Sequence, residues 1–205
     1  MQHEPIVRHL NRSAVLYLVL ALGSAATLAY GEREGTGSPV AITGETALRI
    51  EMKAAGSEER EVIGVIRVSQ RATGVVIEPA LEGLTPGMHG LHIHEGDSCE
   101  AGATEESGRA AGSSVEPAEE AGEHWDPGIK GNHGGPWGHG HRGDLPNVFV
   151  DDSGTAETAL YAPRVTTRDF QNRALVLHSK RDNYSDEPDS TGGTGRAIAC
   201  GIAED

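Results

Sequence analysis

The residues of this sequence best suited to chemistry are its histidines, of which there are ten. Two of them, His3 and His9, lie near the N-terminus, away from the others. His92 and His94 are separated by one residue, and side chains at i and i+2 of a β-strand share a face. Their imidazoles would therefore point into one space, about 7 Å apart along the strand. This arrangement suits two ligands of one metal ion, although two surface histidines on a half-buried strand give the same pattern.

A second group of possible ligands lies in a Gly-rich segment and comprises His124, His133, His141 and Asp144. Three imidazoles and one carboxylate can form a closed tetrahedral site, which zinc accepts. The alternative is a His-rich tract over residues 132–141 that buffers metal ions loosely. His178 ends a strand-like run and is a further candidate ligand, although a lone histidine there is more often structural.

Short strand-like runs must position these side chains. Residues 62–68 are rich in β-branched types, which favour strand over helix. The expected strands are residues 47–52, 62–68, 74–79, 91–94, 147–150, 156–161, 174–178 and 197–202. Residues 85–87 indicate a turn, and residues 151–154 are a candidate hairpin turn. Many short strands with long connections predict an antiparallel sandwich or barrel.

Two long stretches without periodicity are expected to be loops, at residues 95–144 and 179–195. A structureless loop as long as the first is uncommon inside a compact domain and is usually functional. Within it, residues 100–123 read as an acidic insertion whose role the sequence does not reveal.

The N-terminal segment has the features of an export signal. Arg8 and Arg12 precede an uncharged run over residues 14–30, with small residues at its end. Cleavage after Ala26 or Ala29 would fit this reading. The run also reaches the lower edge of a membrane span, about 17–25 residues, so an uncleaved anchor is the alternative. The expected organisation is a signal peptide or anchor over residues 1–30, a flexible linker over 31–43 and one domain over 44–205. Both readings place that domain outside the cytoplasm, in the periplasm or secreted.

Charge and cysteine content narrow the possible partners. The formal net charge is −14, which argues against nucleic acid because phosphate binding needs a basic face. An anionic substrate would need a local positive patch to offset the repulsive far field. The two cysteines, Cys99 and Cys200, are expected to form one disulfide in an exported chain, rather than two unrelated buried thiols.

Together these segments resemble the copper,zinc superoxide dismutases, in particular their bacterial exported branch. The similarity spans about residues 45–203 and consists of several motifs in the family's order. The matching segments are 87–95 (GMHGLHIHE), 124–127 (HWDP), 133–136 (HGGP), 141–147 (HRGDLPN), 175–178 (LVLH), 182–186 (DNYSD) and 199–202 (ACGI). The resemblance implies a Greek-key antiparallel β-sandwich or flattened barrel of about eight strands with two long functional loops.

The resemblance also implies a ligand set for each of two metals. Copper would be bound by His92, His94, His124 and His178. Zinc would be bound by His124, His133, His141 and Asp144. His124 would bridge the two ions through both ring nitrogens. Asp182 matches the carboxylate that links His92 to His133, and Cys99 matches the loop cysteine that pairs with Cys200. His89 matches a structural histidine, and His139 has no counterpart that we can place.

The implied reaction is dismutation of superoxide to oxygen and hydrogen peroxide by a one-electron copper cycle, in which His124 takes up a proton. The family guides the anion with an arginine three residues before the last cysteine, but that position is Ala197 here. Arg196 is adjacent, and a one-residue shift on a strand turns a side chain to the opposite face. A local bulge would re-aim Arg196. Alternatively, Lys180 and Arg181 would supply positive potential.

Two other functions remain open at this level. The same ligands would serve an exported copper- or zinc-binding module with little or no turnover, which the alanine at position 197 favours. A copper-only enzyme is disfavoured because His133, His141 and Asp144 are all present. The sequence does not distinguish a monomer from a homodimer, and it allows membrane association only if the N-terminal run is retained.

Overall fold

The computed structural model describes residues 47–56, 60–102 and 117–203 of the chain. The expected signal or anchor at residues 1–30 and the linker at 31–43 lie outside the described residues, as does most of the acidic insertion. No helix within the described ranges has the length and apolar character needed to cross a membrane.

The described chain is built from β-strands, all paired antiparallel. The strands are β1 (Leu48–Ala54), β2 (Val62–Gln70), β3 (Val75–Leu81), β4 (Gly87–His89), β5 (Leu91–Ile93), β6 (Val148–Val150), β7 (Leu160–Ala162), β8 (Ala174–His178) and β9 (Ala197–Ile202). Two short 3-10 helices, Glu119–Ala121 and Thr167–Phe170, interrupt the connections.

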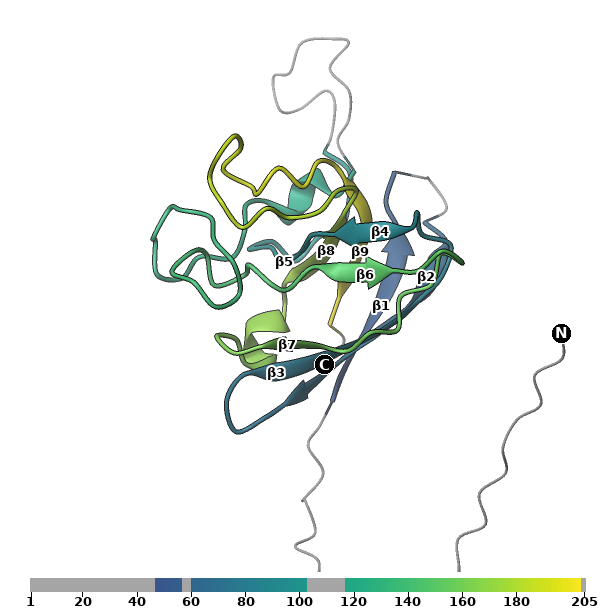
Figure 1. Ribbon diagram of the computed structural model, residues 1–205, viewed down its shortest axis with the longest axis horizontal. Coiled ribbons are helices and arrows are strands. Elements are labelled where there is room, and N and C mark those ends of the chain that lie inside the picture. The colour runs from purple at the N-terminus through teal and green to yellow at the C-terminus, as the bar shows by residue number, and fades with distance from the viewer. Residues whose placement is uncertain (1–46, 57–59, 103–116, 204–205) are drawn as a thin grey trace, which may run out of the picture. The chain divides into compact units, whose positions relative to one another are not determined.

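Seven of the strands form one curled sheet, in the order β5-β8-β9-β1-β2-β3-β7, and β4 pairs with β6 in a second, smaller sheet (Figure 1). The predicted fold class, an all-β antiparallel sandwich or barrel with two long loops, is confirmed. The first loop leaves β5 and returns to β6, and the second connects β8 to β9. Both therefore start from the neighbouring strands β5 and β8, which pair with each other.

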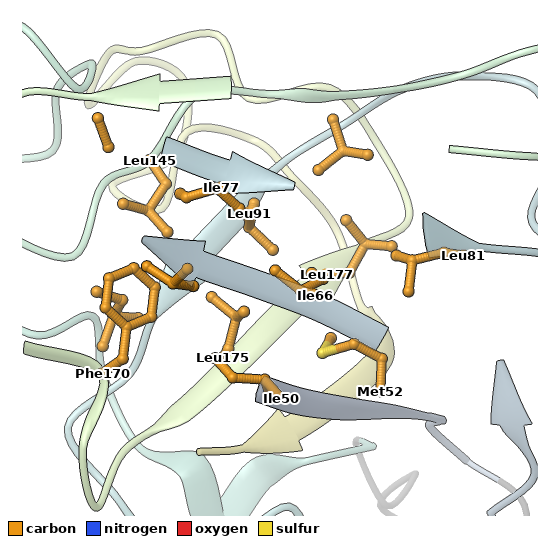
Figure 2. Close-up of a cluster of buried hydrophobic side chains, with 14 of the residues drawn as sticks. Ile50, Met52, Ile66, Ile77, Leu81, Leu91, Leu145, Phe170, Leu175 and Leu177 are labelled. Carbon is orange, nitrogen blue, oxygen red and sulfur yellow. The ribbon is translucent and has the colours of Figure 1, made fainter. Parts of the chain in front are cut away.

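Alternating apolar residues explain why these strands curl around one core. In β1, Leu48, Ile50 and Met52 point inward while Arg49 is exposed, as expected for a strand buried on one face. Figure 2 shows side chains from several strands meeting in this cluster. Leu145 of the first loop and Phe170, the last residue of the 3-10 helix Thr167–Phe170, are also fully buried there. Leu145 directly follows Asp144, so its burial, which stabilises by about 1.5–3 kcal/mol, fastens the first loop to the core.

Three sequence-based predictions need correction. The expected strands do not include β4, because three residues are too few to show alternation, and Gly87, expected in a turn, begins this strand. The strand expected at residues 156–161 is limited to β7 at Leu160–Ala162. The segment 151–154 does form a turn, in which Asp151 Oδ1 accepts hydrogen bonds from the amides of Ser153 and Thr155. It is not a hairpin, however, because β6 pairs with β4 whereas β7 pairs with β3. Pairing partners depend on tertiary packing, which turn chemistry alone does not encode.

The predicted disulfide is confirmed between Cys99 and Cys200, whose Cα atoms lie 5.7 Å apart. It joins the start of the first loop to β9 across a sequence separation of 101 residues. Closing a loop of this length stabilises a fold by roughly 4–5 kcal/mol in the chain-entropy model. The bridge therefore ties the loop that carries the second histidine group to the sheet.

Candidate metal centre

The first group of histidines is positioned by strand pairing. His92 in β5 lies opposite Val176 in β8, and β8 ends at His178. Leu175 and Leu177 of β8 belong to the core, so alternation turns Val176 and His178 to the other face, where His92 also lies. His94 follows β5 and forms an isolated antiparallel bridge with His124 from the first loop.

These four imidazoles converge on one space. One ligand atom from each of His92, His94, His124 and His178 lies within 4.8 Å of the others. The Nε2 atoms of His94 and His178 are 3.5 Å apart, and the ring centroids of His92 and His124 are 3.9 Å apart. All four residues are buried, with at most 8% of their surface exposed. The group could hold one metal ion between its nitrogens.

Burial also keeps these rings in the form that binds metals. It lowers the pKa of His92 and His94 well below the usual value, and the nearby histidines lower it further. Burial lowers the pKa of His178 to about 4, with a smaller contribution from His124. Neutral imidazole, which offers a lone pair, is the metal-binding form. At neutral pH these three ligands are therefore ready to bind a cation without first losing a proton.

The second group surrounds a single carboxylate oxygen. Asp144 Oδ1 lies 3.1 Å from His124 Nδ1, 3.1 Å from His133 Nδ1 and 3.3 Å from His141 Nδ1. In a tetrahedral zinc site with metal–ligand bonds of about 2.0 Å, neighbouring ligand atoms lie about 3.3 Å apart. Three ligand pairs thus already have the spacing that a small tetrahedral cation imposes. His124 belongs to both groups.

Unpaired nitrogens support a metal at this place. The buried Nδ1 atoms of His92, His133 and His141 have no hydrogen-bond partner. Buried polar atoms almost always have one, so three orphaned nitrogens in one cluster indicate a missing partner. The donor set of imidazoles and one carboxylate is suited to copper and zinc. The residues present therefore fit both ions that the sequence motifs imply.

Asp182 orients two of these rings through hydrogen bonds to their Nε2 atoms, on the side away from the unpaired Nδ1 atoms. This fully buried residue accepts a hydrogen bond from His92 Nε2 at Oδ2 and another from His133 Nε2 at Oδ1, both at 2.8 Å. With the proton on Nε2, His92 presents an unprotonated Nδ1 to the space in front of it, and His133 does so once a cation has displaced its second proton. Asp182 is itself held through its backbone by Asn147, which donates to its carbonyl and accepts from its amide.

Carboxylates dominate the electrostatics of the second group. Burial would lower the pKa of His133, but Asp144 and Asp182 outweigh it and raise the pKa to about 9. Burial would likewise raise the pKa of Asp144, but the hydrogen bond from His124 and the adjacent charge of His133 hold it well below the usual range. Without metal, Asp144 is thus ionised and His133 protonated at neutral pH. A cation that binds here must displace that proton.

Arginines that the sequence analysis did not single out hold the first loop in place. Arg164 donates hydrogen bonds to the carbonyl oxygens of Gly135, Pro136, Gly140 and His141. Arg173 stacks on Trp125, next to His124, with its guanidinium carbon 3.5 Å from the ring centroid. No sequence signal marks these contacts, because each arginine lies far along the chain from the loop it contacts.

The other expected site residues lie outside the two groups. His89 is buried and bonded to the carbonyl oxygens of Thr85 and His178, which matches a structural histidine. His139 is exposed. A bulge does occur in β9, because Leu177 pairs with Ala199 while His178 pairs with Ala197. Cross-strand partners share a face, so it is Ala197 that lies beside His178. Arg196 is exposed and precedes the strand.

A cavity of about 440 Å³ opens beside the two groups. His124 and His141 line it, together with Trp125 and Ile129. Three carboxylate residues, Glu95, Glu123 and Asp126, and the second-loop residues Ser190 and Thr191 complete its wall with Gly131. The cavity gives small molecules access to the ring shared by both groups.

The fold and the two adjoining ligand groups define an all-β metalloprotein with a two-metal centre. The family model described as "Copper/zinc superoxide dismutase (SODC)" matches residues 62–203. The chain is 41% identical over 143 residues to "Superoxide dismutase [Cu-Zn]" of Photobacterium leiognathi, which covers 69% of this chain and 79% of that protein. It is also 41% identical over 141 residues to the protein of the same name from Escherichia coli K12, covering 68% and 78%.

Solved structures agree with this result. The Cu/Zn superoxide dismutase from Brucella abortus superposes with a TM-score of 0.69 at 34% identity, covering 77% of this chain and 99% of that one. The monomeric enzyme from Salmonella enterica gives a TM-score of 0.65 at 34% identity with the same coverage. The chain belongs to the copper/zinc superoxide dismutase family.

Proposed function

We propose that this chain dismutates superoxide at a centre in which His92, His94, His124 and His178 hold copper, and His124, His133, His141 and Asp144 hold zinc. The observation that carries this assignment is the position of His124. Its Nδ1 lies 3.1 Å from Asp144 in one group, and the residue also belongs to the four-histidine group. One imidazole can therefore serve both ions through its two nitrogens.

Bound copper supplies the one-electron exchange that superoxide dismutation needs, whereas zinc has no redox chemistry. The chain's own residues do the rest. His124 is placed to take up a proton on the nitrogen that faces the four-histidine group, while its Nδ1 stays beside Asp144. Because Nδ1 is held beside Asp144, the ring would keep its position while the other nitrogen carries the proton. Burial of His92 and His178 excludes bulk water from the same space.

Asp182 is a positioning residue in this proposal. Because it accepts from both His92 and His133, it sets the tautomer of one ligand in each metal site. The two sites thus share a carboxylate behind their ligands as well as an imidazole between the ions.

The proposal includes export from the cytoplasm. The Cys99–Cys200 disulfide supports it, since disulfides persist in oxidising compartments. We infer a signal peptide or anchor over residues 1–30, a linker over 31–43 and the enzyme domain over 44–205, acting in the periplasm or after secretion. Membrane contact is expected only if the N-terminal run is retained. The assembly expected is a monomer or homodimer, and the Salmonella enterica relative is described as monomeric.

The test is a superoxide assay on protein loaded with copper and zinc, with an equal concentration of free copper ions as reference. Turnover well above free copper is expected, and His178→Gln should remove most of it. His139→Gln changes an exposed histidine outside both groups and serves as the matched control. Metal binding without turnover above free copper would favour the alternative, a metal-binding module, which the alanine beside His178 also favours.

A further inference from the structure

Three backbone segments that carry ligands are joined by a closed set of hydrogen bonds. The amide of Trp125 donates to the carbonyl of Ile93 at 2.8 Å, and the amide of Ile93 donates to the carbonyl of Gly143 at 3.0 Å. The amide of Gly143 donates back to the carbonyl of Trp125 at 2.8 Å. Ile93 ends β5, whereas the other two residues come from separate places in the first loop. Together they form a backbone triangle, with Ile93, Trp125 and Gly143 at its corners.

The corners of the backbone triangle adjoin ligands of both proposed metal sites. Their chain neighbours include the ligands His92, His94, His124 and Asp144. Trp125 directly follows His124, and Gly143 directly precedes Asp144. Because a peptide unit is planar and consecutive Cα atoms are about 3.8 Å apart, fixing a corner restricts where its neighbour can stand. The triangle therefore sets the position of the His124 imidazole relative to the other ligands.

The triangle closes only because Gly143 has no side chain. A Cβ atom there would overlap the carbonyl oxygen of Ile93 and lie 3.0 Å from the amide nitrogen of Trp125. These two atoms are the acceptor and the donor of one side of the triangle. Gly143 does not have a positive φ, so lack of space and not backbone conformation excludes a side chain. Any larger residue must push this corner away from the other two.

The segment between β7 and β8 holds the triangle from outside. The guanidinium carbon of Arg173 lies 3.5 Å from the centroid of the Trp125 ring, which also packs against the core. A cation over an indole face is the most favourable of the cation–aromatic pairs. Arg173 also donates to backbone carbonyl oxygens at the end of the helix Thr167–Phe170. From the same helix, Asp169 forms a two-point ion pair with Arg142, next to the third corner.

We propose that Gly143 and Arg173 are positioning residues for His124, which act through Trp125. The missing side chain of Gly143 lets the triangle close, and Arg173 holds the ring of Trp125 in place beside it. This inference rests on the proposed function, because it concerns the imidazole that would bridge both ions. Metal–ligand distances tolerate only about 0.2 Å, so a small opening of the triangle leaves His124 able to serve one ion but not both.

The experiment loads purified protein with copper and with cobalt(II) in place of zinc. Cobalt(II) binds the same nitrogen and oxygen donors and is paramagnetic. An imidazolate shared by the two ions couples their electron spins and suppresses the electron paramagnetic resonance signal of copper. The fraction of copper that keeps its ordinary signal at full loading therefore reports the shared imidazole, which a loss of stability alone would not change. Cobalt affinity and the superoxide turnover of the copper and zinc form are also measured.

Each variant has a matched control. Gly143→Ala is compared with Gly138→Ala in the same loop, where a Cβ atom would meet nothing closer than 3.5 Å and φ is likewise not positive. Arg173→Gln is compared with Arg168→Gln, which removes the same charge from an exposed residue of the neighbouring helix.

We expect a suppressed copper signal in the parent and in both controls. Gly143→Ala should weaken cobalt binding by about 10–100-fold, as for other residues that orient ligands, and its copper should give the ordinary signal. Arg173→Gln should weaken cobalt binding by about 3–10-fold, the size of a partly buried cation–π contact, and uncouple part of the copper. If Gly143→Ala does not fold, the comparison of Arg173→Gln with Arg168→Gln decides.

The outcomes separate this inference from the proposed function. A variant whose copper stays as strongly coupled as that of its control would overturn the role of that residue and leave the proposed function standing. An ordinary copper signal in the parent would refute the shared imidazole, and with it both proposals. Coupling that is lost in the variants, in a parent without superoxide turnover above free copper, would uphold the positioning roles and refute the proposed function.

Discussion

Replacing Asp182 by asparagine tests how the chain prepares both metal sites at once. The carboxylate accepts a hydrogen bond from His92 on one oxygen and from His133 on the other. An asparagine of the same shape can accept with its oxygen but must donate with its nitrogen. One of the two histidines then has to offer an unprotonated Nε2 and carry its proton on Nδ1, the atom that should bind metal.

The expected loss is larger for zinc. His92 is fixed by its strand, whereas His133 belongs to a loop that Asp182 helps to hold. The substitution also removes a negative charge next to His133, which weakens the attraction of the zinc group for a cation. Loss of such an outer partner typically weakens metal binding by about 10–100-fold, equivalent to about 1.4–2.7 kcal/mol. We therefore expect zinc affinity to fall within this range and copper affinity to fall by less.

Competition with a chromophoric chelator measures both affinities on the purified protein. Asp152→Asn makes the same chemical change at an exposed turn position and should bind both metals like the parent. The reasoning would be refuted if Asp182→Asn bound zinc as tightly as the control. It would also be refuted if copper affinity fell while zinc affinity did not change.

Three further predictions concern the disulfide, the pH dependence and the guiding charge. Replacing Cys99 and Cys200 by serine should lower the free energy of unfolding by roughly 4–5 kcal/mol in urea titrations, and a change below about 1 kcal/mol would contradict the role given to the bridge. Metal-free protein should lose stability as the pH falls from about 6.5 to about 4. The folded state holds the pKa of His178 at about 4, so the unfolded chain binds a proton at higher pH than the folded chain does. His178 alone lowers the free energy of unfolding by about 3 kcal/mol over that pH range. His92 and His94 act in the same direction. Urea titrations that show a constant free energy of unfolding over this range would contradict the burial of these rings. Ala197→Arg should raise the rate constant with superoxide several-fold, since its side chain starts beside His178, whereas an unchanged rate in pulse radiolysis would show that this face does not guide the anion.

The sequence predicted most of the fold because alternation, β-branched content and turn residues indicated the same short strands along the chain. Strands β8 and β9 have the predicted boundaries, and alternation correctly placed His92 inside a strand. It failed for β4, whose three residues show no pattern, and for the turn at residues 151–154, whose flanking strands pair elsewhere. Which strands pair is decided by packing over long sequence separations.

The sequence predicted those site residues whose side-chain type itself indicates metal binding. Histidines at short spacing indicated ligands, and the family motifs named Asp144 and Asp182. The supporting contacts of Arg164 and Arg173 could not be found in this way, because arginine is common on surfaces and its partners here are backbone carbonyls and an indole ring. The acidic cavity wall also emerged only from the fold, since Glu95 and Glu123 are far apart along the chain.

The shared imidazole is tested most directly by anomalous difference maps from crystals of the loaded protein, recorded at the copper and zinc absorption edges. Two peaks should flank the ring of His124, with zinc on the side of Nδ1 and Asp144 and copper among His92, His94 and His178. A single peak, or two peaks that do not share the His124 ring, would contradict the two-metal centre and the enzymatic assignment built on it.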